Sequence, residues 1–133
     1  MRDIKFRAWL KSNKLMYNVL CVDIAEKKAF IEHSDMRGYA KYPEEIKLMQ
    51  CIGLKDKSGK DIYEGDIVKA ISFARWIGVV KYSDENQAFI FDDLDKKYRR
   101  DSIVFMSQFD EGFKILGNIY ENPELLKELT NDN

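Results

Sequence analysis

The sequence is poor in the residues that most often carry catalysis or bind metal. It has one histidine and two cysteines among 133 residues, and the cysteines do not form a Cys-x-x-Cys pair. Neither a Walker-type phosphate loop nor a Gly-x-Gly-x-x-Gly or Gly-x-Ser-x-Gly motif is present. These absences argue against a zinc site, a common nucleotide-binding fold and a serine hydrolase. We therefore expect no enzymatic activity, no cofactor and no metal site.

Long hydrophobic runs are also missing. No apolar stretch approaches the roughly 20 residues that span a bilayer, and the first residues lack the apolar segment of a signal peptide. Cys21 and Cys51 lie inside short apolar runs, where free cysteines are usually buried. We expect a cytoplasmic protein without a membrane partner, whose thiols are free and buried in a reducing compartment.

Neither sign of charge dominates the chain. It has 22 basic and 23 acidic residues, a formal net charge of −1. A nucleic-acid-binding protein that relies on overall charge is usually strongly basic, so any such function here would need a local patch. Hydrophobic residues make up 45% and aromatic residues 13% of the chain, which is too many for a disordered protein.

The first half of the chain shows the alternation of β-strands. Residues 4–10 place Ile4, Phe6, Ala8 and Leu10 on one face. The polar residues 11–14 indicate a turn, and residues 15–24 are again β-prone, so the two runs are predicted to form a hairpin. Residues 28–33 add a third strand. Residues 34–47 are interpreted as a connection, in which residues 43–47 could form a short helix.

The second half has five short apolar runs separated by turns, a spacing typical of a small barrel. The runs are residues 66–73, 78–82, 88–91, 102–106 and 113–120. Asn122 is a candidate cap for a final helix, and Pro123 suits its first position. We predict a mainly β protein. Residues 55–133 form a small, partly open SH3-like barrel with a short C-terminal helix. Residues 1–54 form an N-terminal β-hairpin layer, and both parts make one compact unit.

Three stretches of the chain carry a family resemblance. They are Phe6-Arg7-Ala8-Trp9, then the run from Leu48 to Val68 with Gly53-Leu54-Lys55-Asp56-Lys57-Ser58-Gly59-Lys60 at its centre, and Gly117-Asn118-Ile119-Tyr120-Glu121-Asn122-Pro123-Glu124-Leu125-Leu126. In this order and spacing they resemble the YopX-like family of phage and prophage proteins, whose function is largely uncharacterised. The resemblance implies a β-rich fold with barrel character and a phage or prophage origin. It implies no catalytic residue.

One basic run is the best candidate for contact with nucleic acid. Its residues are Lys96, Lys97, Tyr98, Arg99 and Arg100. Lysine and arginine neutralise phosphates, and the tyrosine can stack on a base. Basic residues near the N-terminus would extend the patch if they share its face; these are Arg2, Lys5, Arg7, Lys11 and Lys14. The alternative is a solvated loop whose charge is offset by nearby aspartates.

Two features are candidates for a protein interface. Trp76 stands between Arg75 and Ile77 beside a turn, and an exposed tryptophan often anchors an interface, although tryptophan is usually at least half-buried. The final predicted helix carries an apolar stripe of Leu125, Leu126 and Leu129. A helix this short needs packing to persist, so the stripe should contact the barrel or a neighbouring subunit.

An enzyme would need convergent polar groups, and the sequence offers one such combination. His33, the only histidine, could act with Asp61, Glu64 or Asp66. The alternative, which we favour, is that Gly65-Asp66 forms a turn that leads into a strand. The sequence therefore favours a non-enzymatic accessory module of phage origin that contacts proteins or copies of itself. The alternative is a DNA- or RNA-associated module that uses the basic patches.

Overall fold

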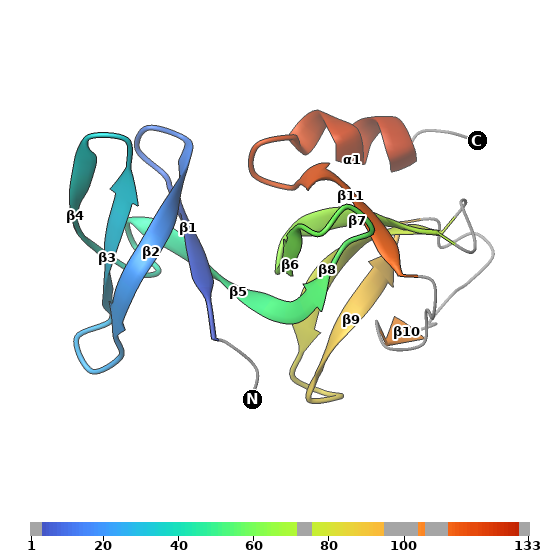
Figure 1. Cartoon of the computed structure of the whole chain (residues 1–133), viewed down its shortest axis with the longest axis horizontal. Coiled ribbons are helices and arrows are strands. Elements are labelled where there is room, and N and C mark those ends of the chain that lie inside the picture. Colours follow the sequence, from blue (N-terminus) through green and yellow to red (C-terminus); the bar gives the residue numbers. More distant parts are fainter. Residues whose placement is uncertain (1–3, 72–75, 95–103, 106–111, 131–133) are drawn as a thin grey trace. The chain divides into compact units, whose positions relative to one another are not determined.

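The computed structural model describes residues 4–71, 76–94, 104–105 and 112–130. These residues form eleven strands and one short helix (Figure 1), so the predicted mainly β class is confirmed. The chain divides into two compact units, Met1–Cys51 and Ile52–Asn133, whereas the sequence analysis places its boundary between residues 54 and 55. The expectation that both parts make one compact body stays a prediction. No helix in the described part of the chain is long and apolar enough to cross a membrane.

The N-terminal unit is built on an antiparallel sheet. Its strands are β1 (Phe6–Leu10), β2 (Leu15–Asp23), β3 (Lys28–His33), β4 (Met36–Lys41) and the first part of β5 (Ile46–Lys55). They stand in the order β4-β3-β2-β1-β5, and β6 (Asp61–Tyr63), from the second unit, follows β5. The predicted β1–β2 hairpin and the third strand are both confirmed.

The region between residues 34 and 47 differs from the prediction. It contains strand β4, and β5 begins at Ile46, so the option of a helix over residues 43–47 is wrong. Strand β4 lies at an edge of the sheet, and Ala40 is its one fully buried residue. An edge strand that is exposed on most sides lacks the alternation of apolar and polar residues by which strands are recognised. This is why the sequence analysis missed it.

One face of this sheet forms the core of the N-terminal unit. The buried members of the core are Ala8, Tyr17, Ala29, Ile31, Ala40 and Ile46. A register shift between Val19 and Cys21 interrupts the β2–β3 pairing, and Cys21 then stands opposite Phe30. Because this shift moves Cys21 to the outer face, its thiol is exposed, and the predicted burial of Cys21 is wrong. Cys51 is buried and free, as expected.

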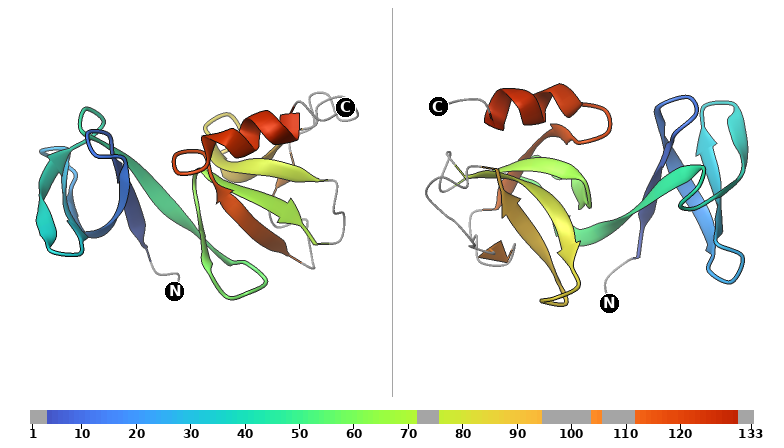
Figure 2. Two further views of the ribbon diagram at one scale, coloured as in Figure 1. Left: turned by 90° about the horizontal axis from the view of Figure 1, so that it is seen from above. Right: turned by 180° about the vertical axis from the view of Figure 1, so that it is seen from behind.

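The C-terminal unit has its own five-stranded antiparallel sheet and the helix. The strands are β7 (Asp66–Ala70), β8 (Ile77–Ser83), β9 (Ala88–Asp93), β10 (Val104–Phe105) and β11 (Phe113–Asn118), and the helix is α1 (Pro123–Thr130). The sheet order is β10-β9-β8-β7-β11. Because β10 and β11 are opposite edges, the described strands do not close into a barrel. Figure 2 shows α1 beside β11, next to one edge of this sheet.

The core of the C-terminal unit centres on two phenylalanines. Phe91 and Phe113 come from β9 and β11, and their ring centroids lie 5.5 Å apart. They pack with Ile52, Ile62, Val68, Ala70 and Val80. These aliphatic residues come from β5, β6, β7 and β8, so the core joins the end of β5 and the short β6 to the five-stranded sheet.

Candidate functional site

The carboxylate of Asp56, in the turn between β5 and β6, accepts four hydrogen bonds. Its Oδ1 accepts hydrogen bonds from Ser58 N (2.9 Å), Ser58 Oγ (2.8 Å) and Lys60 N (2.9 Å). Its Oδ2 accepts one from Ile115 N on β11 at 3.2 Å. The side chain is buried. One carboxylate therefore closes its own turn and fastens that turn to β11.

These contacts set the ionisation of Asp56. Burial opposes the charged form and would raise the pKa. The hydrogen bonds from Lys60, Ser58 and Ile115 favour the charged form and outweigh burial, so the pKa of Asp56 is lowered from its ordinary value. A carboxylate that is ionised and fully engaged with local donors is a structural group. It is not poised to take up a proton in a reaction.

The carboxylates singled out from the sequence are likewise in structural positions. Asp66 is buried, and its Oδ2 accepts a hydrogen bond from Tyr63 N at 2.8 Å. Gly65 has a φ of 90°, so the predicted Gly65-Asp66 turn is confirmed. Asp61 pairs with Lys55 at 2.9 Å on the surface. Among the described residues, no group of three or more His, Cys, Asp or Glu side chains is arranged to hold a metal ion.

His33 belongs to the N-terminal unit, whereas Asp61, Glu64 and Asp66 belong to the C-terminal unit. It ends β3, and its ring lies beside that of Tyr17 with 5.4 Å between centroids. Its Nδ1 is buried without a hydrogen-bond partner in the described part of the chain. The Tyr17 hydroxyl is engaged elsewhere, since it accepts from Asn13 Nδ2 at 2.6 Å. The described contact of the His33 ring is thus an aromatic one, with Tyr17.

The basic residues proposed for nucleic-acid contact are only partly placed. Lys96, Lys97, Tyr98, Arg99 and Arg100 lie outside the described residues, as does Arg2. Lys5, Lys11 and Lys14 are exposed and Arg7 is half-buried in the N-terminal unit. The Lys11 ammonium donates to the carbonyl oxygen of Pro43. The predicted combination of the two patches therefore stays a prediction.

The interface candidates all lie in the C-terminal unit. Trp76 is half-buried and packs against the core cluster around Phe91 and Phe113, while its carbonyl oxygen accepts a hydrogen bond from Ala70 N at 2.9 Å. Leu125, Leu126 and Leu129 are half-buried on α1. Each side chain is thus partly covered by its own unit, and a role in an interface stays a prediction.

Residues 119–122 join β11 to α1, and Asn118 and Asn122 stand at the two ends of this connection. Asn118 is buried, and its Oδ1 accepts from Tyr120 N (3.0 Å) and Glu121 N (2.8 Å). The side chain of Asn122 was expected to cap α1. Instead its Oδ1 accepts from Asn118 N at 3.1 Å, and its backbone carbonyl accepts from Leu125 N at 3.0 Å. Pro123 occupies the first helical position as predicted.

Gly117→Ala is expected to loosen this connection. A Cβ at residue 117 would lie 2.6 Å from Asn122 Oδ1 and 2.9 Å from Leu125 Cδ1. Both atoms end flexible side chains and can move, but moving them breaks the Asn118–Asn122 bond, so we expect a loss of about 1–2 kcal/mol in the free energy of unfolding. Hydrogen exchange of α1 amides should rise more than that of β8 amides. Equal protection of α1 in both proteins would contradict this account.

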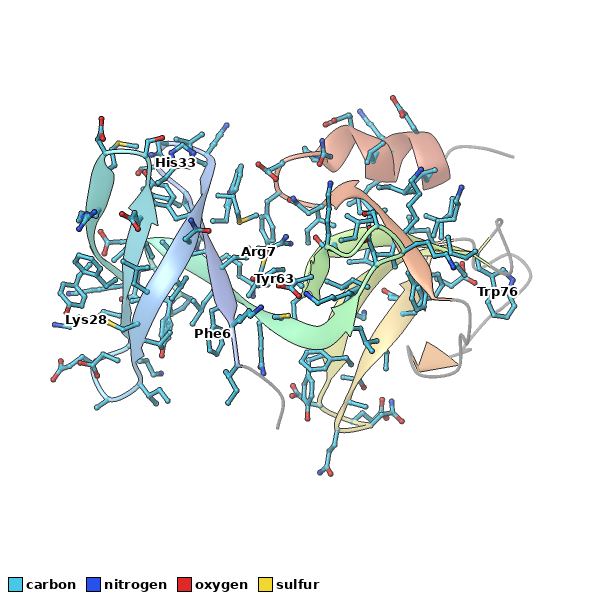
Figure 3. All side chains as sticks on the ribbon, in the orientation of Figure 1. Phe6, Arg7, Lys28, His33, Tyr63 and Trp76 are labelled. Atoms are coloured by element: carbon cyan, nitrogen blue, oxygen red, sulfur yellow. The ribbon has the colours of Figure 1, made fainter. Side chains whose placement is uncertain are left out.

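The outer face of the N-terminal sheet holds a cluster that the sequence analysis did not identify. The rings of Phe30 and Tyr39, opposite each other on β3 and β4, meet edge to face at 5.0 Å. Lys28 Nζ lies 4.8 Å from the centroid of the Tyr39 ring. Figure 3 shows Lys28 and His33 near the two ends of β3. Next along β4, Arg37 forms a 2.7 Å ion pair with Glu32.

Two residues of this edge are unusually exposed for their type. The exposed fractions of Met36 and Tyr39 on β4 are 47% and 60%. The only available signal in the sequence was a tyrosine between Gly38 and Ala40 in a polar stretch, which does not distinguish a surface strand from a loop. Exposed apolar and aromatic residues on an unpaired edge strand form a surface suited to another strand.

Comparisons with known proteins agree with the fold. The crystal structure of protein EF1440 from Enterococcus faecalis is similar to this chain, with 26% sequence identity and a TM-score of 0.59. The match covers 95% of this chain and 99% of the other. No curated protein matches the chain significantly. A family described as YopX protein matches residues 5–127, a span that includes all three stretches on which the resemblance rested. The chain therefore belongs to the YopX family.

Proposed function

We propose that this protein is a non-enzymatic accessory module of phage or prophage origin that works in the cytoplasm by contacting proteins, including further copies of itself. The observation that carries this proposal is the unpaired edge strand β4, with Met36 and Tyr39 exposed on it. A role without catalysis is also supported by three buried polar side chains, Asp56, Asp66 and Asn118, which are engaged in turns of their own chain. Use of the C-terminal unit as an SH3-like module belongs to the same proposal.

A DNA- or RNA-associated module is the second candidate. It is favoured by the basic run of residues 96–100 and by the exposed Lys5, Lys11 and Lys14. Binding that depends on these side chains would release counterions and weaken steeply as salt rises. Association through β4 relies on backbone hydrogen bonds and apolar contact, so salt should affect it less.

Light scattering across a concentration series separates the two candidates. Molar mass would be measured from about 10 µM to 1 mM protein, a range that detects weak assemblies. Each measurement is made at low and moderate salt, with and without a mixed pool of single- and double-stranded oligonucleotides. We expect the mass to rise with protein concentration at both salts in the absence of the pool. A constant monomer mass, together with a salt-sensitive increase when the pool is added, would instead support the nucleic-acid module.

A further inference from the structure

Strand β4 directs a defined set of backbone groups away from its sheet. In an antiparallel pair, hydrogen-bonded and non-hydrogen-bonded residue pairs alternate. Tyr42 N donates to Lys27 O at 3.0 Å, which makes these residues a hydrogen-bonded pair and fixes the alternation along β3–β4. The even-numbered residues of β4 therefore bond to β3. The N–H and C=O groups of Arg37, Tyr39 and Lys41 point to the free side.

Only part of this free side is available. Glu45 engages both outward groups of Lys41, because Lys41 N donates to Glu45 Oε1 at 2.8 Å and Glu45 N donates to Lys41 O at 2.9 Å. No described residue bonds to the outward groups of Arg37 or Tyr39, and Figures 1 and 2 show β4 at the end of the sheet. The open template is thus two donors and two acceptors on alternate residues.

A second copy of β4 can satisfy this template best in one register. Two antiparallel copies related by a twofold axis at Gly38 place Arg37 of each opposite Tyr39 of the other. All four outward donors then find acceptors, giving four hydrogen bonds. An axis at Tyr39 pairs Tyr39 with its own copy but sets Arg37 against Lys41, whose groups are already used. An axis at Arg37 sets the two arginines opposite each other, which like charges disfavour.

Side chains favour the same register. Arg37 would lie beside the exposed Tyr39 ring of the other copy, a pairing of guanidinium and aromatic face that is attractive. Asp35 would stand opposite Lys41, an opposite-charge pair. On the core side, the exposed Met36 would cover Ala40 of the other copy. A Cβ at Gly38 would meet nothing within 4 Å, so the chain itself leaves space at the axis.

We infer that two copies of this chain associate edge to edge through β4, antiparallel and with the twofold axis at Gly38. This inference rests on the proposed self-association and names its surface and register. Strand pairing at one edge buries little area, so the dimer should be weak and reversible, with a dissociation constant on the order of 0.1 mM. With twofold symmetry, the β4 edge of each copy is covered by the β4 edge of the other. No β4 edge remains free for a third copy, so assembly through β4 ends at the dimer.

Disulfide trapping tests the register. In a Cys21→Ser background, which removes the exposed thiol, Gly38→Cys would face its own copy across a non-hydrogen-bonded pair. The Cα atoms there are about 4.5 Å apart, within disulfide range. Arg37→Cys and Tyr39→Cys are matched controls, since each would lie about two residues out of register with its copy. Glu44→Cys, at an exposed turn position, measures random collision.

Under mild oxidation we expect Gly38→Cys to form covalent dimer about tenfold faster than the other three variants. Faster trapping at residue 37 or 39, or equal rates at all four positions, overturns the inferred register. Light scattering on the Cys21→Ser protein tests self-association separately from its register. Self-association with no preference for Gly38→Cys rejects the register alone, whereas a monomer at every concentration rejects the proposed self-association as well.

Charge exchange gives an independent test that needs no new thiol. Asp35→Lys and Lys41→Asp each place like charges opposite one another across the proposed axis, and each should weaken association about three- to tenfold. The double variant restores opposite charges and should return within about twofold of the unaltered protein. Both side chains are exposed, so folding should be unaffected. Additive losses in the double variant would contradict the pairing.

Discussion

Asp56→Ala is expected to lower the free energy of unfolding of the C-terminal unit by about 3 kcal/mol. The substitution removes the acceptor of four hydrogen bonds, from Ser58 N, Ser58 Oγ, Lys60 N and Ile115 N. Water can replace some of these hydrogen bonds, because the turn residues around Asp56 are exposed. The Ile115 amide lies on β11, and without its bond to Asp56 the turn is held to that strand by the backbone bond from Lys57 N to Phe113 O (2.8 Å). The Asp56 side chain thus stabilises both its own turn and the contact of that turn with β11.

The measurement can be made specific to one unit, because each unit contains one of the two tryptophans. In a Trp9→Phe background, Trp76 fluorescence during urea unfolding follows the C-terminal unit. Asp84→Ala is the matched control: Asp84 is also a turn aspartate but is exposed, and its replacement should change stability by less than about 0.5 kcal/mol. Similar losses for both variants would show that the Asp56 network contributes little.

The same carboxylate gives a dependence on pH whose sign follows from its lowered pKa. A group whose pKa is lower in the folded state stabilises that state above its unfolded pKa, about 3.9 for aspartate, and the contribution disappears as pH falls through the folded value. We expect the stability difference between the unaltered protein and Asp56→Asn to be constant near neutral pH and to shrink below about pH 4. A difference that grows on acidification would contradict a lowered pKa.

The turn that holds Asp56 could be predicted from the sequence, but the contact of Asp56 with β11 could not. The polar run of residues 55–61 predicts a turn with Gly59 at positive φ, and the φ of Gly59 is 93°. That signal is local, because glycine is the residue that adopts this conformation without strain. The docking of Asp56 on Ile115 joins residues 59 positions apart. No local pattern encodes such a contact, so the burial of the carboxylate could not be anticipated.

Strands were predictable where one face is buried and the other is not. The β1–β2 hairpin and the runs that became β8 and β9 carry this alternation. Strand β4 does not, since its sequence Met36–Lys41 is exposed along most of its length. The candidate interaction surface therefore lies where the signal for a strand is weakest. A free edge has few buried residues, and few buried residues leave little periodicity.

The exposure of Cys21 is a second feature that the sequence did not predict. Its apolar neighbours predicted burial, but the irregular pairing between Val19 and Cys21 sends the thiol to the outer face. Because side chains alternate with a period of two, one extra residue reverses the face of everything that follows it. The bulge depends on how β2 meets β3, and its position was not visible in β2 alone.

Gly78→Ala is expected to destabilise the C-terminal unit by about 3 kcal/mol, through steric conflict at the middle of its sheet. Gly78 lies on β8, the central strand in the order β10-β9-β8-β7-β11. A Cβ there would lie 2.6 Å from the backbone oxygen of Asp92, 2.9 Å from its carbonyl carbon and 3.0 Å from Phe91 Cζ. Backbone atoms of a paired strand cannot move aside as a side-chain end can, so β8 and β9 must separate locally.

Gly38→Ala provides the comparison that isolates this cause, because Gly38 is also a strand glycine but a Cβ there has nothing within 4 Å. Alanine reduces the conformational freedom of the unfolded chain. At Gly38 we therefore expect the free energy of unfolding to change by less than about 0.5 kcal/mol or to rise slightly. Urea unfolding would follow Trp76 for the Gly78 variant and Trp9, in a Trp76→Phe background, for the Gly38 variant. If glycine were needed at both sites merely for flexibility, both variants would lose stability. A loss confined to Gly78→Ala means that the close approach of Asp92, and with it the packing of β8 on β9, requires the absence of a side chain.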